Sequence, residues 1–370
     1  MKYKLKEIFD LHMGKTPSRN NAEYWNSNEY KWISIADLSK TGKYIRDTKE
    51  HLSKQAIDES GIKLIPANTV IMSFKLSIGK TAITAEDMYS NEAIMAFHDK
   101  HVVDILPEYL FYMFKFKNWD EGSNKAVMGK TLNKATLSDV EIDVCSIEKQ
   151  REIVDILNKI MNILENRDNE IVLLDNLIKA RFVEMFVKNE YDWKEVTIAE
   201  VCIDMRTGPF GSSLHHDEFV DKGVFVLGID NAVENTFSYN RMRYITEEKY
   251  EKLKRYTVYP GDVIITIMGT VGKAVVIPKN MPKAINTKHL ACLTPNTEIV
   301  DSYFLVNAFQ IHPLIRHQLE SQCKGAIMDG LNLTIIKGLK FKLPPIKLQR
   351  KFVEFYNQVD KLLRKQSELV

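Results

Sequence analysis

The chain has 370 residues, enough for about two domains, and its 45% hydrophobic and 27% charged residues are ordinary for a soluble globular protein. It contains no apolar run of membrane-spanning length, and the basic segment Met1–Lys6 is followed by no apolar core, so we expect neither a membrane span nor a secretory signal. The net charge of +2 is too small to indicate nucleic-acid binding, so a DNA-binding surface would have to come from local clustering.

The first part of the chain alternates short β-branched runs with turn residues. We predict strands near residues 32–36, 69–73, 81–85 and 93–97. The segment Ser77-Ile78-Gly79-Lys80 joins the second and third strands as a glycine-containing hairpin turn. A helix is expected around residues 107–116. Residues 1–146 are therefore predicted to form a mixed α+β module.

Residues 147–190 are predicted to form one long helix. Apolar residues recur alternately four and three positions apart between Ile153 and Met185, which is the period of a coiled coil. As one helix, residues 149–188 would span ~60 Å at 1.5 Å per residue, which is too long to pack on one small module, so a second helix should lie along it. Arg167 and Arg181 interrupt the apolar seam and are expected to help set its register.

Residues 191–345 are predicted to repeat the first module. Strands are expected near residues 224–229, 262–267, 273–277 and 289–293, and a helix over 302–319. Six landmarks occur in the same order in both halves, at a separation that drifts from about 193 to 199 residues, which favours internal duplication. Among them, Ile147-Glu148-Lys149-Gln150-Arg151 matches Ile346-Lys347-Leu348-Gln349-Arg350.

The last segment, residues 346–370, continues the three–four step of apolar residues from Phe352 to Leu369. We expect it to pack along the first long helix and, because it is shorter, to leave part of that helix for a partner protein. The expected fold class is α+β, with two tandem domains separated by long antiparallel coiled-coil helices and a pseudo-two-fold internal repeat.

The sequence contains no recognisable motif for catalysis or metal binding. Gly79-Lys80-Thr81 resembles the end of a phosphate-binding loop, but Phe74 stands where that loop needs its first glycine. The four cysteines are scattered without metal-ligand spacing, and His215-His216 on a polar loop is more typical of ordinary surface. We therefore predict no catalytic residue, no metal site and no cofactor in this chain.

Several loop motifs carry a resemblance to a known family. They are Thr207–Leu214, Val226–Asn231, Pro260–Ile264, Asn286–His289, Lys324–Ala326 and Leu343–Arg350, with Gly14–Ser18, Trp32–Asp37 and Ile65-Pro66 in the first module. Over nearly its whole length the chain resembles the specificity subunit of type I restriction–modification enzymes. It departs from the family pattern at Val144–Ile147, where a proline pair is common, and in its short second helix.

The resemblance implies a non-catalytic, cytoplasmic subunit that recognises double-stranded DNA. Each module would read one half of a split, asymmetric target, and the helices would set the gap between the halves. Two methyltransferase (M) subunits would dock on the helices and supply S-adenosylmethionine, and motor–nuclease (R) subunits with ATP and Mg2+ would join for cleavage. The alternatives are a specificity subunit of a methylation-only or differently organised system, a coiled-coil adaptor that does not touch DNA, or an enzyme with an unrecognised site.

Candidate DNA-binding residues are the basic and small polar side chains of the turn-rich loops. They are Ser18, Arg19, Lys75, Lys80 and Lys130 in the first module, and Arg206, Ser212, Ser213, Thr270, Lys273, Lys288, His289 and Lys324 in the second. Lys80 and Lys273 sit at matched hairpin turns and are predicted to contact phosphates. Arg206, beside a Gly/Ser loop, is predicted to reach a guanine edge in a bidentate manner. For each of them, an ordinary surface or structural role is the alternative.

Overall fold

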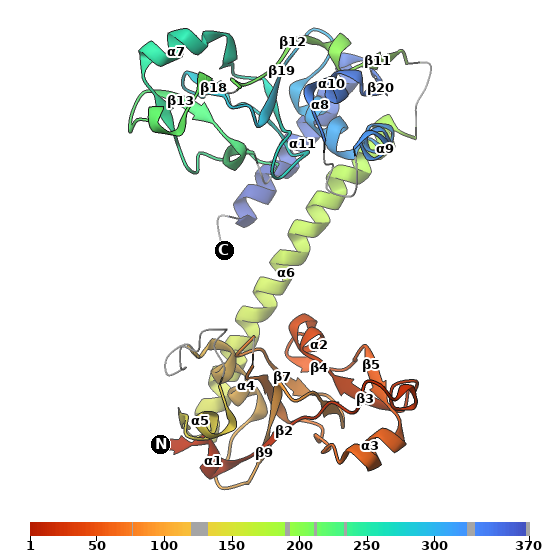
Figure 1. Cartoon of the computed structure of the whole chain (residues 1–370), viewed down its shortest axis with the longest axis vertical. Coiled ribbons are helices and arrows are strands. Elements are labelled where there is room, and N and C mark those ends of the chain that lie inside the picture. The colour runs from red at the N-terminus through yellow and green to blue at the C-terminus, as the bar shows by residue number, and fades with distance from the viewer. Residues whose placement is uncertain are drawn as a thin grey trace. The chain divides into compact units, whose positions relative to one another are not determined.

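The computed structural model describes residues 1–75, 77–119, 132–188, 193–210, 213–232, 235–323 and 330–367. The chain divides into two compact units, Met1–Glu165 and Asn166–Val370, and the boundary between them falls within the long helix α6 (Ile147–Phe186) (Figure 1). Each unit contains one mixed α+β module, so the predicted fold class of two tandem modules joined through long helices is confirmed.

The first module is built on a five-stranded sheet of order β2-β9-β6-β7-β4 and a three-stranded sheet of order β5-β3-β8. The strands are β1 (Lys2–Lys4), β2 (Phe9–Met13), β3 (Tyr30–Ile33), β4 (Tyr44–Ile45), β5 (Glu50–Leu52), β6 (Val70–Ser73), β7 (Thr81–Thr84), β8 (Tyr89–Ser90), β9 (Ile94–Asp99) and β10 (Glu141–Asp143). The helices are α1 (Leu5–Ile8), α2 (Ile35–Lys40), α3 (Lys54–Ser60), α4 (Pro107–Phe116) and α5 (Lys134–Ser138).

The second module has two four-stranded sheets, of order β12-β19-β16-β17 and β14-β13-β18-β15. The strands are β11 (Glu195–Thr197), β12 (Cys202–Thr207), β13 (Val224–Leu227), β14 (Tyr244–Ile245), β15 (Thr257–Val258), β16 (Val263–Thr266), β17 (Ala274–Val276), β18 (Ala284–Asn286), β19 (Leu290–Pro295) and β20 (Lys340–Lys342). The helices are α7 (Glu247–Leu253), α8 (Ser302–Ile311), α9 (Pro313–Gln322), α10 (Leu333–Gly338) and α11 (Ile346–Ser367).

Strands β6 and β16 lie inside their modules with both faces covered. Val70 and Met72 pack with α4 in one apolar cluster, while Ile71 packs with the other sheet in a second cluster. Val263 and Ile264 divide between two clusters in the same way. Because both faces are covered, these strands are continuously apolar, which is the pattern that made them visible in the sequence.

Strand registers match the two modules residue by residue. Ser73 pairs with Ile94 as Thr266 pairs with Leu290, so these positions are equivalent. Asn68 (φ 61°) and Gly261 (φ 87°) both adopt the left-handed conformation, and their N–H groups donate to the equivalent carbonyls of Thr84 and Ile277. This alignment confirms the duplicated hairpin. It also shows that the prolines at positions 66 and 260, which precede the hairpin, are not equivalent, because they are offset by one residue.

Two expectations need correction. The expected helix over 302–319 is two helices, α8 and α9, because Pro313 has no N–H to donate and its ring excludes the preceding helical turn. Strands β2 and β12, which pair with β9 and β19, were not predicted. Charged and polar residues interrupt both, so neither shows a continuous apolar run. The five residues of β2 do alternate between apolar and polar, a signal that the prediction overlooked, whereas those of β12 do not alternate cleanly.

A buried glutamine fastens the start of each long helix to its module. The side-chain amide of Gln150 donates to the carbonyls of Asp104 and Cys145, and its oxygen accepts from the N–H of Leu106. Gln349 makes the same three bonds, to the carbonyls of Ile299 and Pro344 and from the N–H of Asp301. These bonds explain why Gln-Arg recurs at both helix starts.

We expect Gln349→Ala to lower the free energy of unfolding of the second unit by about 1–3 kcal/mol, because it leaves buried main-chain groups without partners. Urea titration would measure the change. The matched variant Gln318→Ala, on the partly exposed α9, should cost clearly less. An equal effect of the two substitutions would contradict this role for Gln349.

Helix α11 packs antiparallel against the C-terminal part of α6. Phe182 and Phe186 of α6 are buried against Phe352 at the start of α11, with ring centroids 5.4 and 5.5 Å apart. The predicted pairing of the long helices is therefore observed here. Arg181, however, is 35% exposed and pairs with Glu184, so the seam runs through Phe182 rather than Arg181.

Apolar side chains N-terminal to this contact are exposed on α6. They include Ile156, Ile160, Ile163, Leu164, Val172, Leu173 and Leu177. Exposed apolar residues at this density along one helix are typical of a surface that binds another protein.

Candidate nucleic-acid interface

Most of the candidate residues that the structure describes gather at one end of the main sheet in each module. In the second module, β12 ends at Thr207, β19 begins at Leu290, and the β16–β17 turn lies between Thr266 and Ala274. Since these neighbours are antiparallel, the three loops lie side by side. We call this surface the loop edge: residues 208–210, 213, 267–273 and 287–289 in the second module, and 14–19, 74–75, 77–80 and 91–93 in the first.

The hairpin turns of the two loop edges are built alike. The hydroxyl of Ser73 accepts from the N–H of Lys80 (3.1 Å), and that of Thr266 accepts from the N–H of Lys273 (2.9 Å). The same hydroxyls donate back into the turn, to the carbonyls of Ser77 and Thr270. Lys80 and Lys273 therefore occupy equivalent positions, as the sequence predicted.

A glycine lets the neighbouring loops cross in each module. A Cβ atom on Gly14 would lie 2.2 Å from the carbonyl oxygen of Asn91, and one on Gly208 would lie 2.2 Å from the carbonyl carbon of Thr287. No side chain fits at that distance, so glycine is required for the close approach. The crossing holds the loop after β2 against the segment before β9, and the loop after β12 against the segment before β19. These parts of the loop edge therefore have a fixed geometry.

In the first module the candidates surround a carboxylate. Thr16 donates to Glu92 and lowers the pKa of Glu92, and the charges of Lys75 and Arg19 act in the same direction. Arg19 also pairs with Glu50 and lies 3.7 Å above the ring centroid of Trp25.

Two further first-module candidates have partners of their own. The Lys80 Nζ donates to the Ser39 hydroxyl at 2.5 Å, and the carbonyl of the exposed Ser18 accepts from the indole of Trp25. Lys130 lies outside the described residues.

In the second module the loop edge carries cations. Lys288 and Thr270 are exposed, Ser213 is partly buried, and Lys273 lines a cavity of about 600 Å³ beside α6, α8 and α11. Burial lowers the pKa of His289, and the charges of Lys288 and Arg243 lower it further, so this imidazole is neutral at pH 7. Ser212 and Lys324 lie outside the described residues.

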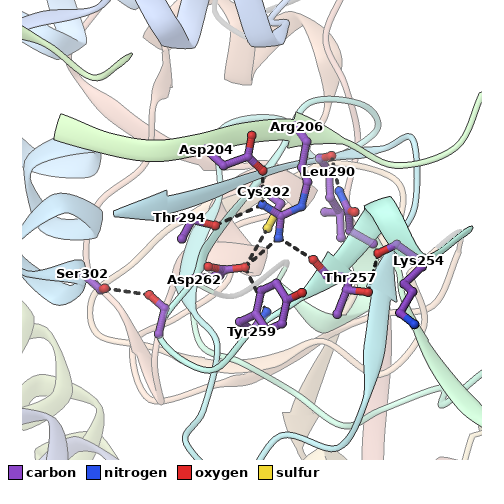
Figure 2. A network of polar contacts seen from close by, with 12 residues as sticks. Asp204, Arg206, Lys254, Thr257, Tyr259, Asp262, Leu290, Cys292, Thr294 and Ser302 are labelled. Atoms are coloured by element: carbon purple, nitrogen blue, oxygen red, sulfur yellow. Dashed lines mark hydrogen bonds and ion pairs between the residues drawn. The ribbon is translucent and has the colours of Figure 1, made fainter. Parts of the chain in front are cut away.

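The structure does not place the Arg206 side chain where the sequence predicted it, at a DNA-facing surface. Its side chain is 13% exposed and points into the module, where it pairs with Asp204 and with Asp262, itself 2% exposed (Figure 2). It also donates to the Thr294 hydroxyl and the Thr257 carbonyl. A guanidinium held by these four groups is not free to reach a guanine edge. In this structure Arg206 instead stabilises the part of the sheet next to the loop edge.

Sequence reasoning missed three charged residues near the loop edges. Arg243 pairs with Asp230 at 2.6 Å, close enough to His289 to influence its pKa, and the exposed Arg241 lies near the same carboxylate. Glu92 was overlooked because only cations and small polar residues were considered. The Arg-x-Arg pattern at 241–243 and the alignment of Glu92 with Lys288 were signals that could have identified them.

Neither a metal-ligating cluster nor a membrane-spanning helix is found in the described parts of the chain. No group of three or more His, Cys, Asp or Glu residues that could hold a metal ion occurs among them. Nor does any helix within the described ranges combine the length and apolar character needed to cross a membrane. The loop edges supply hydrogen-bond donors and acceptors on rigid supports, which suits recognition of a polar surface.

Comparison with known proteins relates nearly the whole chain to one protein family. A family model described as the type I restriction modification DNA specificity domain matches residues 1–173 and again residues 190–369. The type I restriction enzyme MjaIX specificity subunit of Methanocaldococcus jannaschii is 28% identical over 191 residues, which are 50% of this chain and 44% of that protein. The putative MjaX specificity subunit of the same organism is 22% identical over 367 residues, covering 91% of this chain and 81% of that protein.

Solved structures share the fold. The S subunit of a type I restriction–modification system from M. genitalium aligns with a TM-score of 0.59 at 15% identity, over 100% of this chain and 91% of that one. A chain from a structure describing complex assembly and conformational transition of the type I R-M system aligns with a TM-score of 0.62 at 17% identity, over 100% and 93%.

Proposed function

The chain belongs to the type I restriction–modification DNA specificity family, and we propose that it is the non-catalytic subunit that selects the DNA target of such a complex. Each loop edge reads one half of a bipartite, asymmetric sequence. The observation that carries this proposal is the duplication of the loop edge, with equivalent hairpins and glycine crossings in both modules. Two such edges in one chain suit a target with two separate halves.

The spacer helix supports a fixed gap between the halves. DNA repeats every ~34 Å along its axis, so two recognition surfaces must be held at a defined separation to meet the same groove. A continuous helix of 40 residues is ~60 Å long and resists bending, whereas a flexible linker would allow many separations.

Methyltransferase subunits are the partners that we propose for the spacer. The exposed apolar side chains of α6 give them a surface on which to dock. They would bring S-adenosylmethionine, and motor–nuclease subunits with ATP and Mg2+ would join where the system also cleaves DNA. The complex would act in the cytoplasm, where the chromosomal DNA lies.

The decisive experiment maps methylated adenines across the host genome with and without this gene. We expect one bipartite motif with an unread gap to lose methylation when the gene is deleted and to regain it on complementation. The purified chain, mixed with its methyltransferase, should direct methylation to the same motif. If the methylated sites do not change on deletion, or if the purified chain fails to direct methylation, the chain is an adaptor and the proposal is wrong.

A further inference from the structure

One position of the loop edge carries opposite charges in the two modules. The strand registers make Glu92 equivalent to Lys288. Three pairs of main-chain hydrogen bonds confirm the match, each between 2.9 and 3.2 Å. Asn91 and Thr287 donate to Ile33 and Leu227, Ile94 and Leu290 donate to Asn91 and Thr287, and Phe74 and Ile267 donate to Ala93 and His289. The main-chain hydrogen bonding around this position is therefore the same in both modules, whereas the side chain differs.

Both side chains are available to a ligand. Glu92 and Lys288 are exposed. Each directly precedes a residue, Ala93 or His289, whose carbonyl accepts a hydrogen bond from the N–H that follows β6 or β16. Thr16 bonds one carboxylate oxygen of Glu92, which leaves acceptor capacity on the other oxygen. The lowered pKa of Glu92 keeps it ionised at pH 7, so it can only accept hydrogen bonds. Lys288 forms no ion pair with any residue that the structure describes, and as an ammonium group it can only donate.

A carboxylate at this position is informative because phosphates repel it. A residue that served only to hold the DNA backbone would be basic in both modules. In the major groove, however, a carboxylate accepts from the amino group of cytosine, and lysine donates to O6 and N7 of guanine. The charge reversal therefore fits base selection better than phosphate binding.

We propose that this position selects a base in each half of the target. Glu92 accepts from an exocyclic amino group, cytosine N4 first, and Lys288 donates to the acceptor edge of guanine. The inference rests on the proposed function and adds the chemical identity of one base contact in each half.

The test uses the complete chain assembled with its methyltransferase, and duplexes that differ from the genomic motif by one base pair. We expect Lys288→Met to reduce discrimination roughly 10- to 100-fold at one guanine in one half, and Glu92→Gln to do the same at one cytosine or adenine in the other half. Replacing that guanine by 7-deazaguanine, which lacks the N7 acceptor, should cost the wild type affinity and cost Lys288→Met little more. A base analogue without the exocyclic amino group should behave in the same way towards Glu92→Gln.

Control variants separate base selection from general effects. Lys279→Glu changes an exposed lysine on the loop that follows β17, at the far end of the strand from the hairpin turn, and should leave every base preference unchanged. Thr16→Val, a change within the loop edge, removes the hydroxyl that bonds Glu92 while keeping the carboxylate, and should reduce the preference in that half less than Glu92→Gln does.

The outcomes are distinguishable. If Lys288→Met or Glu92→Gln weakens binding to all duplexes alike, or alters no base preference, the inference is overturned while the wild-type complex still recognises its motif. If the wild-type complex recognises no bipartite motif at all, the proposed function itself has failed.

Discussion

Replacing Asp262 with alanine is expected to lower the free energy of unfolding of the second module by about 3 kcal/mol, because it removes the buried counter-ion of Arg206 and leaves the guanidinium only the exposed carboxylate of Asp204. The Asp262 carboxylate accepts from Arg206 at 2.9 Å and also from the N–H of Tyr259 at 2.9 Å, so the substitution removes both an ion pair and a turn bond (Figure 2). It lies at the start of β16, the strand that leads directly into the Lys273 hairpin.

Hydrogen exchange measured by mass spectrometry would locate the effect. Amides of β12, β16 and β19 should exchange faster in Asp262→Ala, whereas those of the first module should not change. Asp230→Ala is the matched control, because Asp230 is one-third exposed and its pair with Arg243 should contribute less than about 1 kcal/mol. Adding Arg206→Met to Asp262→Leu should recover much of the loss, since neither charge then remains buried. Equal destabilisation by Asp262→Ala and Asp230→Ala would refute the role assigned to this pair.

The same network explains why the inward orientation of Arg206 was not predicted from the sequence. Its partner Asp262 lies 56 positions away in sequence, and only the pairing of β12 and β16 with β19 brings the two together. The sequence of β12 also does not indicate which of its side chains face inwards. A register shift between Cys202 and Asp204 leaves Ile203 72% exposed, while Arg206 further along turns inwards. An irregularity of this kind depends on the partner strand and cannot be inferred from one segment.

Features that depend on local geometry were predicted well. The hairpins were found because glycines at 79 and 272 adopt φ values of 88° and 81°, which the surrounding turn requires and glycine supplies most easily. The sequence analysis did not consider Glu92, although the alignment of the two halves had already matched it with Lys288. Sequence reasoning about DNA binding looks for cations, whereas base recognition also uses acceptors.

The long helix shows both the strength and the limit of periodicity. The three–four repeat predicted one continuous α6 and its pairing with the C-terminal helix, and both are observed. Periodicity cannot tell which part of an apolar stripe is covered, and Leu173 in the middle of α6 is 66% exposed while Phe182 is fully buried. The position of burial is decided by where α8 and α11 meet α6, which is a matter of tertiary structure.

Replacing Phe182 with alanine is expected to destabilise the second unit by about 3–5 kcal/mol, because it opens a cavity where three helices meet. The ring lies 5.8 Å from Phe304 of α8 and 5.4 Å from Phe352 of α11, measured between centroids, and it is completely buried. These contacts fix the second module and α11 to the spacer helix. The variant should therefore also weaken binding to the complete bipartite target.

Urea titration would measure the stability, and competition between full targets and isolated half-targets would measure the loss of coupling between the modules. Leu173→Ala, on the exposed face of the same helix, should change stability by less than about 0.5 kcal/mol. If Leu173→Ala nonetheless reduces assembly with the methyltransferase, the covered and uncovered parts of α6 serve different purposes: one holds the module and the other binds the partner. If Phe182→Ala is no more destabilising than Leu173→Ala, the aromatic contact does not hold the second module to the spacer.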